Sequence, residues 1–490
     1  MQRLTHHGIP AVLVLLSLAG CTDQPSPTDP LAAAPLANAS AGVGGKFLVA
    51  FSDRRAPADF EARISERGGT VEKILAGPGI AIVSGLTSEG AAELSATGGI
   101  DAVAEDMALA PGAPEEETTA PGPWASIAGS SESELTTDAA SGKPLPDDAS
   151  NYGSQWNMRI IHAESAWHAG DFGSPTVRVY LLDTGVDYTR IDLRAHVDPA
   201  RSISLVPKND AAGELALAEA EHLAPYMDFH SHGTAVASTI VSNGIDLAGV
   251  TTKTKIVAVK VLDRTRVGLF STFIKGIDYA AKDGADIIHL SLAYPGFSRA
   301  SPNAAAMIVM ADLATTYAHE QGAVIMVAGG NAAANLDNPS FWRFCNAQYV
   351  LCVSATAAND QPASYTNYGV NTVTFAGPGG DVVTTSDPRS SMKVLVNCSS
   401  FGLVTTGNVA PCGAGGPRFE TTGTTYAAAA ASGLAALIIS RIGHNQPDRV
   451  RDLLVSSADD LGPPGRDKFY GAGRINVARA LELLGDQKDH

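Results

Sequence analysis

The sequence predicts an α/β fold in which a doubly wound, mostly parallel sheet is flanked by helices. The first observation is a set of short, continuous Val/Ile/Leu runs, which are typical of strands buried on both faces. The second is that helical stretches separate these runs, as in parallel sheets joined by crossover helices. The expected strands are 177–182, 255–262, 287–292, 323–328 and 349–355, and the expected helices include 234–242, 272–282 and 305–320.

A smaller pattern of strands and helices precedes this region, in residues 46–110. Its elements follow the order strand, helix, strand, strand, helix, strand, which predicts a small ferredoxin-like α+β domain. A pair of glycines ends each helical stretch. The expected strands are 47–51, 70–75, 80–83 and 100–104, and the expected helices are 57–67 and 88–96.

The remaining segments are expected to connect or extend these two domains. Residues 21–45 are predicted to form a flexible tether, with a polar, Pro-rich start and an Ala- and Gly-rich end. Residues 111–150 are rich in Pro, Ser, Thr, Gly and acidic residues without periodicity, which predicts a disordered linker. The α/β domain is then expected to span 151–484, followed by a tail at 485–490.

The first twenty residues, 1–20, are typical of an export signal. Arg3 supplies positive charge, and residues 9–19 form an apolar run too short to span a bilayer. The run ends in Leu18-Ala19-Gly20-Cys21, which resembles a bacterial lipobox. That resemblance implies cleavage before Cys21, diacylation of its sulfur and anchoring to a membrane outside the cytoplasm. An ordinary signal peptide with a chance cysteine, or an uncleaved anchor, are the alternatives.

Composition limits the classes of function. The chain has 490 residues, which is more than one ordinary domain, and 45% of them are hydrophobic, which is ample for a large core. Its net charge is −17, whereas nucleic-acid binding needs concentrated Lys and Arg. We therefore expect no nucleic-acid partner, and we assign the acidity to solubility.

Four further cysteines remain for an oxidising compartment, in which disulfides persist. Four thiols allow three pairings. We expect the pairs that lie close in the sequence, Cys345–Cys352 and Cys398–Cys412, each closing a short loop. A zinc site is the rival interpretation, but no CxxC motif or neighbouring histidine supports it.

Four polar side chains stand at strand ends or helix starts, in an order that suggests nucleophilic catalysis. Asp183 and Asn331 each follow an expected strand, while His232 and Thr425 each begin an apolar helix. The carboxylate can orient the imidazole, the imidazole can take a proton from the hydroxyl, and the amide can hold an oxyanion. Each motif alone is a common turn or helix cap. Four of them in this order predict an active site.

These motifs resemble those of the subtilases, the subtilisin-like serine proteases. The resemblance rests on Asp183-Thr184-Gly185, His232-Gly233-Thr234 and Gly423-Thr424-Thr425, and it covers nearly everything from Lys46 onward. It implies that Asp183, His232 and Thr425 form the triad and that Asn331 forms the oxyanion hole. His230 lies off the triad position and is interpreted as a residue at the rim of the site.

The resemblance also implies partners and a location. Residues 46–110 correspond to an inhibitory propeptide, which would be the intramolecular partner of a monomeric, secreted enzyme. The other partner would be an extended peptide or protein, bound by addition as a strand. The residues assigned to substrate binding are Ser291, Leu292, Ala293 and Gly329.

The chain departs from the family pattern at the nucleophile. Thr425 replaces the usual serine, and its extra methyl group restricts χ1. The family's following Ala-Pro-His is replaced by Ala428-Ala429-Ala430, so the helix has been rebuilt beyond its first turn. Ala293 replaces a family glycine and places a Cβ where the substrate backbone would approach.

A calcium ion is the only cofactor that the resemblance raises, and we expect no cofactor. Asp192 and Gln155 match outlying calcium ligands of the family, but the ligand loop between His232 and Gly249 is shortened.

Two functions follow from these observations. The first is a lipid-anchored endopeptidase that is made as a propeptide-inhibited zymogen. The second is a pseudoprotease that binds extended peptides, or its own propeptide, without cleaving them. The chemistry of Thr425 separates the two.

Overall fold

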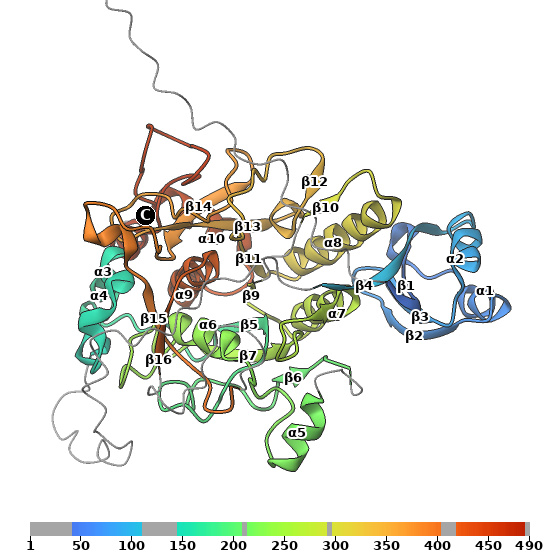
Figure 1. Cartoon of the computed structure of the whole chain (residues 1–490), viewed down its shortest axis with the longest axis horizontal. Coiled ribbons are helices and arrows are strands. Elements are labelled where there is room, and N and C mark those ends of the chain that lie inside the picture. Colours follow the sequence, from blue (N-terminus) through green and yellow to red (C-terminus); the bar gives the residue numbers. More distant parts are fainter. Residues whose placement is uncertain (1–41, 110–144, 208–212, 292–295, 403–417, 486–490) are drawn as a thin grey trace, which may run out of the picture. The chain divides into compact units, whose positions relative to one another are not determined.

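Seven parallel strands form the central sheet of the larger domain (Figure 1). The computed structural model describes residues 42–109, 145–207, 213–291, 296–402 and 418–485. Every strand pairing in this sheet is parallel. The spatial order is β14 (Val373–Pro378), β13 (Val350–Thr356), β11 (Val324–Ala328), β9 (Ile287–Leu290), β5 (Arg178–Asp183), β7 (Lys255–Lys260) and β6 (Ile203–Ser204).

Helices cover both faces of the sheet, as the predicted fold class requires. Alternate residues of β5 enter two different cores, with Leu181 on one side and Leu182 on the other. The first core contains residues of α6 (His232–Ile240) and α9 (Thr424–Ile442). The second contains residues of α7 (Phe270–Lys282) and α8 (Pro302–Glu320). The α/β prediction is therefore confirmed.

Helix α9 crosses the first core and is built almost entirely of small or aliphatic residues. It is the one helix among the described residues that is long and apolar enough to cross a membrane, but 83% of its apolar window is buried within the protein. A Cβ on Gly433 would lie 2.5 Å from Val250 Cβ, and one on Gly377 of β14 would lie 2.7 Å from the Ala427 carbonyl. Small residues are needed because the helix packs this closely, which explains the run of alanines after Thr425.

The sequence patterns missed several elements of the larger domain. Strand β14 was not expected because it ends in Gly377-Pro378, and β6 has only two residues. Two small antiparallel pairs were also missed, β10 (Phe297–Ser298) with β12 (Phe341–Trp342) and β15 (Val394–Asn397) with β16 (Arg418–Thr421). The other helices are α3 (Trp156–Ile160), α4 (Ala163–His168), α5 (Glu214–Ala220), α10 (Pro447–Ser456) and α11 (Val477–Gly485).

The N-terminal domain has the predicted order of elements. A four-stranded antiparallel sheet, in the order β2-β3-β1-β4, carries two helices that share a core with it. The elements are β1 (Gly42–Phe51), α1 (Phe60–Glu66), β2 (Thr70–Leu75), β3 (Ile80–Ser84), α2 (Ser88–Ser95) and β4 (Ile100–Leu109).

The other face of the N-terminal sheet packs against α7 and α8. Leu48, Ile82 and Ala104 belong to the same buried cluster as residues of those helices. The buried Asp106 accepts a hydrogen bond of 2.9 Å from the backbone N–H of Ser271, in the first turn of α7. A carboxylate at this position satisfies a free helix N–H and complements the helix dipole.

Strand β4 also extends into the larger domain. Its last residues pair antiparallel with the short edge strand β8 (Gly268–Leu269), with Ala108 opposite Leu269 and Leu109 opposite Gly268. The N-terminal domain therefore adds its final strand to an edge of the larger domain, next to the loop that follows β7.

The domain boundaries differ slightly from those expected. Strand β1 begins at Gly42, within the expected tether, because Gly42 pairs with Met107. The last residues of the expected linker fold onto the larger domain, since the backbone N–H of Ser150 donates to the Ile245 carbonyl at 3.0 Å. The export signal and most of both linkers lie outside the described residues.

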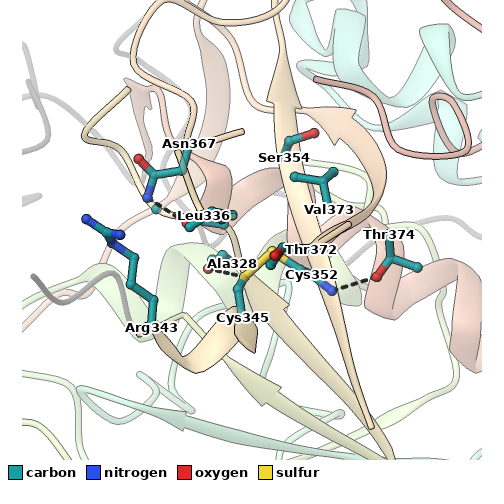
Figure 2. The surroundings of a disulfide bond; sticks show 12 residues. Ala328, Leu336, Arg343, Cys345, Cys352, Ser354, Asn367, Thr372, Val373 and Thr374 are labelled. Atoms are coloured by element: carbon teal, nitrogen blue, oxygen red, sulfur yellow. Dashed lines mark hydrogen bonds between the residues drawn. A yellow bond between two sulfur atoms is a disulfide. The ribbon is translucent and has the colours of Figure 1, made fainter. Parts of the chain in front are cut away.

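The predicted disulfide between Cys345 and Cys352 is confirmed, with an S–S distance of 2.09 Å (Figure 2). It joins β13 to the turn at 344–346, and both cysteines are buried. Cys345 Sγ also lies 3.6 Å from the Ala328 carbonyl at the end of β11. Cys412, the predicted partner of Cys398, lies outside the described residues, so that pairing stays a prediction.

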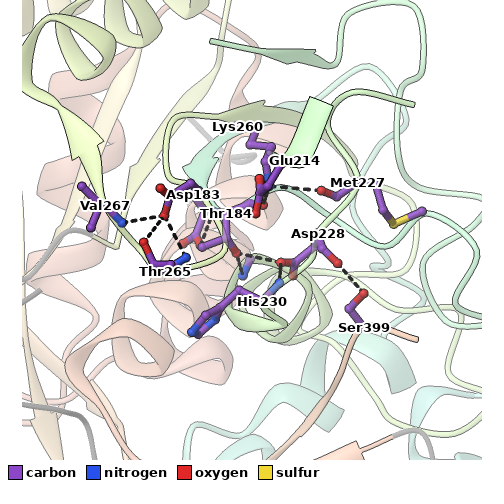
Figure 3. A network of polar contacts seen from close by, with 12 residues as sticks. Asp183, Thr184, Glu214, Met227, Asp228, His230, Lys260, Thr265, Val267 and Ser399 are labelled. Atoms are coloured by element: carbon purple, nitrogen blue, oxygen red, sulfur yellow. Dashed lines mark hydrogen bonds and ion pairs between the residues drawn. The ribbon is translucent and has the colours of Figure 1, made fainter. Parts of the chain in front are cut away.

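A buried lysine supports the loop that follows β5 (Figure 3). Lys260 Nζ donates to the carbonyls of Thr184, at 2.5 Å, and Met227, at 3.1 Å, and pairs with Glu214 at 2.7 Å. Burial raises the pKa of Glu214 to about 7, although attraction to Lys260 opposes this shift. The pair thus fixes the backbone next to Asp183, and it includes a carboxyl group whose pKa is raised.

The raised pKa of Glu214 predicts how stability changes with pH. The folded state keeps this proton up to about pH 7, whereas the unfolded chain releases it near the ordinary glutamate pKa of 4.5. The folded state therefore binds more protons in this window, and the contribution of Glu214 to stability falls as the pH rises through it. The loss is at most on the order of a few kcal/mol.

Unfolding by urea between about pH 5 and pH 8 measures this effect. We expect Glu214→Gln to lose less stability than the wild type as the pH rises. Glu219→Gln, on the exposed side of the same helix, is the matched control and should follow the wild type. Equal pH dependence of the wild type and Glu214→Gln would contradict the prediction.

The side chains that match family calcium ligands are fully occupied by hydrogen bonds within the protein. Asp192 accepts from the backbone N–H groups of Ile245, Asp246 and Leu247 at 3.0 to 3.1 Å, and from Asn397 Nδ2 at 3.1 Å. Gln155 Oε1 accepts from the backbone N–H of Ala248 at 2.7 Å. Calcium needs six to eight oxygen ligands, whereas these oxygens face N–H donors. These residues therefore do not fit a calcium ion.

We expect the thermal unfolding midpoint to be the same in EDTA and in millimolar calcium. An ion that binds the folded state would raise this midpoint by mass action. Asp192→Asn is the control, because its amide group would face N–H donors, and it should lower the midpoint in both buffers. A midpoint for the wild type that rises with calcium would contradict the prediction.

Candidate active site

The centre of the site is a hydrogen bond of 2.7 Å between Asp183 Oδ1 and His232 Nδ1. Both side chains are completely buried. Burial raises the pKa of the Asp183 carboxyl, but attraction to His232 and the hydrogen bonds from His232 and the Thr184 backbone N–H together lower it below the usual value. Because a carboxylate can only accept, Nδ1 carries the proton and Nε2 is the basic nitrogen of the imidazole.

Sheet geometry brings these groups together. Strands β11, β9 and β5 are adjacent and parallel, so Asn331 and Asp183 follow strands that end at the same edge of the sheet. Ligands and catalytic groups collect at this edge in open α/β sheets. Both α6 and α9 begin with a predicted catalytic residue, at His232 and near Thr425.

The loop after β5 and the start of α6 lie so close together that only glycine fits between them. A Cβ on Gly233 would lie 2.0 Å from the Gly185 carbonyl, and Gly185 itself has a φ of 103°. Ser231, just before His232, also has a φ of 103°, which is rare for a residue with a side chain. The backbone that presents the histidine is therefore constrained on both sides.

A buried carboxylate that sequence reasoning missed holds this backbone in place. Asp228 accepts hydrogen bonds from the backbone N–H groups of His230, Ser231 and Thr234 at 2.9 Å (Figure 3). It also accepts from the Thr184 hydroxyl, at 2.9 Å, which links it to the loop after Asp183. The signal in the sequence is an aspartate shortly before an apolar helix, which is a common N-terminal cap.

His230 is half-buried beside His232, as expected for a residue at the rim. Its Nδ1 accepts from the His232 backbone N–H at 3.3 Å, and the two rings are 6.3 Å apart. Burial lowers the pKa of His230 well below its usual value, and the positive charge of Arg266 lowers it further. This second imidazole is therefore neutral near neutral pH.

The Asn331 side chain is fixed against the start of α9. Its Oδ1 accepts from the Thr424 backbone N–H at 3.0 Å and from the Thr424 hydroxyl at 2.8 Å. The Thr424 hydroxyl in turn accepts from the Gly330 backbone N–H at 2.9 Å. Because Oδ1 accepts both of these bonds from Thr424, the residue before Thr425, Nδ2 is the donor group of this amide.

Thr425 is completely buried in the first turn of α9. Helix α9 packs on α6, with Tyr426 and Ala235 in one apolar cluster. Within the described part of the chain, Thr425 Oγ1 makes no hydrogen bond, so a bond to the imidazole is not formed there. Catalytic hydrogen bonds often tighten only when substrate binds, and the threonine methyl group limits χ1.

The residues assigned to substrate binding are placed only in part. Ser291 follows β9 and is buried, whereas Leu292 and Ala293 lie outside the described residues, as does Cys21. The Gly329 backbone is already used by the sheet, since its N–H donates to the Val353 carbonyl and its carbonyl accepts from Asn367. The edge strand Gly268–Leu269, which pairs with β4, was missed by sequence reasoning.

The described ranges contain no group of three or more His, Cys, Asp or Glu side chains arranged to hold a metal ion.

Comparisons with known proteins agree with this fold. The subtilase family matches residues 174–473, more than half of the chain. A thermophilic serine proteinase of Bacillus sp. (strain AK1) is 30% identical over 342 residues, which cover 69% of each protein. Subtilisin amylosacchariticus of Bacillus subtilis subsp. amylosacchariticus is 28% identical over 319 residues, which cover 65% of this chain and 68% of that protein.

A solved structure agrees in fold. The epidermin leader peptide processing serine protease of Staphylococcus aureus superposes with a TM-score of 0.66 at 18% identity, over 89% of this chain and 98% of that one. The chain therefore belongs to the subtilase family, whose relatives named above are serine proteases.

Proposed function

We propose that the protein is an endopeptidase made as a lipid-anchored, inhibited zymogen, in which Thr425 replaces serine as the nucleophile. The observation that carries the proposal is the 2.7 Å hydrogen bond between the buried Asp183 and His232. Another carboxylate–imidazole pair, Asp286 with His444, is partly exposed, whereas the pair of Asp183 and His232 is completely buried. A general base needs such a carboxylate to hold one imidazole nitrogen protonated and the other basic.

The chemistry follows from the positions of these groups. The Thr425 hydroxyl attacks the carbonyl carbon of the peptide bond while its proton passes to His232 Nε2. Asp183 stabilises the imidazolium that forms, and Asn331 Nδ2 donates to the developing oxyanion. His232 then gives the proton to the leaving amine, and water releases the acyl group from Thr425 by the reverse sequence.

The pairing of β4 with β8 supports an inhibitory role for the N-terminal domain. An extended peptide that adds a strand to a sheet edge is a common mode of peptide binding. Here Ala108 and Leu109 occupy such an edge, at β8. Strand β8 begins eight residues after Lys260, and Lys260 pairs with Asp183 in the central sheet. The domain thus blocks an edge at which substrate would bind, and activity requires its release.

Two observations support the proposal that the protein is exported from the cytoplasm. The Leu18-Ala19-Gly20-Cys21 sequence favours lipidation of Cys21 and a membrane anchor outside the cytoplasm. The disulfide between Cys345 and Cys352 is typical of proteins in an oxidising compartment.

One observation favours the second candidate, a pseudoprotease that binds peptides without cleaving them. The Thr425 hydroxyl makes no hydrogen bond within the described residues, and a displacement of about 1 Å lowers a rate on the order of 10²-fold. Under this interpretation the peptide-binding edge is kept while turnover is lost.

Turnover of denatured casein at high enzyme concentration separates the two candidates. We expect slow cleavage by the wild type, and an increase on the order of 10²-fold in Thr425→Ser, which removes the methyl group. Thr425→Ala and His232→Ala should both be inactive, because in subtilisin, a relative of this chain, loss of the nucleophile costs roughly 10⁶ in kcat. Wild-type activity no greater than that of His232→Ala would end the endopeptidase proposal.

Maturation gives an independent prediction. The mature N-terminus should lie between residues 111 and 150 in the wild type and in Thr425→Ser, because cleavage of the linker is assigned to the protein's own site. Thr425→Ala should keep the N-terminal domain attached. Mass spectrometry of both fragments, isolated from the protein's own cells, measures the mature terminus on the larger fragment and the lipid on Cys21 of the released N-terminal fragment. The same cut in Thr425→Ala would show that another protease makes it.

A further inference from the structure

A second fully buried histidine lies beneath the site and has no part in the reaction described above. His289 is on β9, the strand between β5 and β11, where it pairs with Leu181 on one side and Met326 on the other. Its side chain is 0% exposed. Leu181 and Met326 belong to the core that contains α6 and α9, so His289 faces the helix that carries Thr425.

Each ring nitrogen of His289 has one hydroxyl partner. Nδ1 is 2.8 Å from Ser432 Oγ on α9, and Nε2 is 2.5 Å from Ser291 Oγ at the end of β9. Both serines are buried. The imidazole is therefore a polar bridge between a helix and a strand in otherwise apolar surroundings, where every polar group needs a partner.

The two hydrogen bonds of the bridge depend on each other. Burial lowers the pKa of His289 to about 4, attraction to Asp183 raises it, and repulsion from His232 lowers it. A neutral imidazole has one donor and one acceptor. One serine must therefore donate to the ring and the other must accept from it, so the two hydroxyl groups are oriented together.

The two ends of the bridge lie at functional positions. Ser432 is seven residues after Thr425, which is two turns along α9 and on the same face of the helix. Ser291 is the last described residue before Leu292 and Ala293, to which substrate binding is assigned. A shift of α9 along β9 would change the distance between nucleophile and substrate, and the bridge opposes that shift.

We propose that His289 is a positioning residue, which fixes the start of α9 relative to the end of β9 and so holds Thr425 in register with bound substrate. The inference rests on the proposed function of this site. Its alternative is a purely structural histidine, whose loss would lower stability without a specific effect on the site.

The experiment compares His289→Phe with His196→Phe, at temperatures well below either unfolding midpoint. His196 is the matched control because it is also buried and also has two partners, Asn243 and the Thr254 carbonyl, neither of which belongs to α9 or β9. Both variants should have lower unfolding midpoints. His289→Phe should lower kcat/KM on the order of 10²-fold, mainly through kcat, and His196→Phe should leave it within about twofold. His289→Gln, which can donate and accept, should recover most of the loss.

A second measurement keeps the inference separate from the proposed function. Hydrogen exchange followed by mass spectrometry should show faster exchange in His289→Phe at the start of α9 and the end of β9, and no such local change in His196→Phe. This exchange result supports the positioning role of His289 even if the wild type does not cleave casein. Failure to cleave casein would count against the endopeptidase proposal alone. Uniformly faster exchange, or equal losses of activity in the two Phe variants, would overturn the positioning role.

Discussion

The hydrogen bond between Asp183 and His232 is the constraint on which the rest of the site depends. An ionised carboxylate that is completely buried is costly unless it is paired and hydrogen-bonded. Asp183 has His232 Nδ1 and the Thr184 backbone N–H as partners, and the Thr184 hydroxyl links this loop to Asp228. Asp192 follows the same rule elsewhere, since its oxygens organise a third loop. Buried carboxylates that accept hydrogen bonds from backbone N–H groups thus fix the loops at this end of the sheet.

Helix α9 transmits this constraint to Thr425, the proposed nucleophile. Its alanines let it pass close to β14, and Thr424 ties its first turn to Asn331. His289 ties it again two turns later, through Ser432. The threonine methyl group must therefore fit beside a helix that is fixed at its first turn and again two turns later. Rotation of Thr425 toward His232 therefore requires room within a closely packed core, in which even one methyl group matters.

Much of this could be predicted from the sequence, because long buried strands and helix starts leave periodic patterns. The five expected strands, the two-domain order and the family all followed from such patterns, as did the disulfide at Cys345 from its short loop. Strands of two residues, such as β6 and β8, carry no pattern. Asp228 and His289 were missed for another reason: their roles depend on contacts between segments far apart in the chain, and one sequence does not show which segments meet.

The pairing of β4 with Gly268 and Leu269 affects when this edge of the larger domain can bind another peptide. A segment held on the same chain as its binding edge acts at an effective concentration on the order of millimolar. Under the proposed inhibitory role of the N-terminal domain, newly folded molecules therefore need no separate inhibitor to keep other peptides from this edge. Severing that connection would lower the local concentration permanently, so each molecule could pass from closed to open only once.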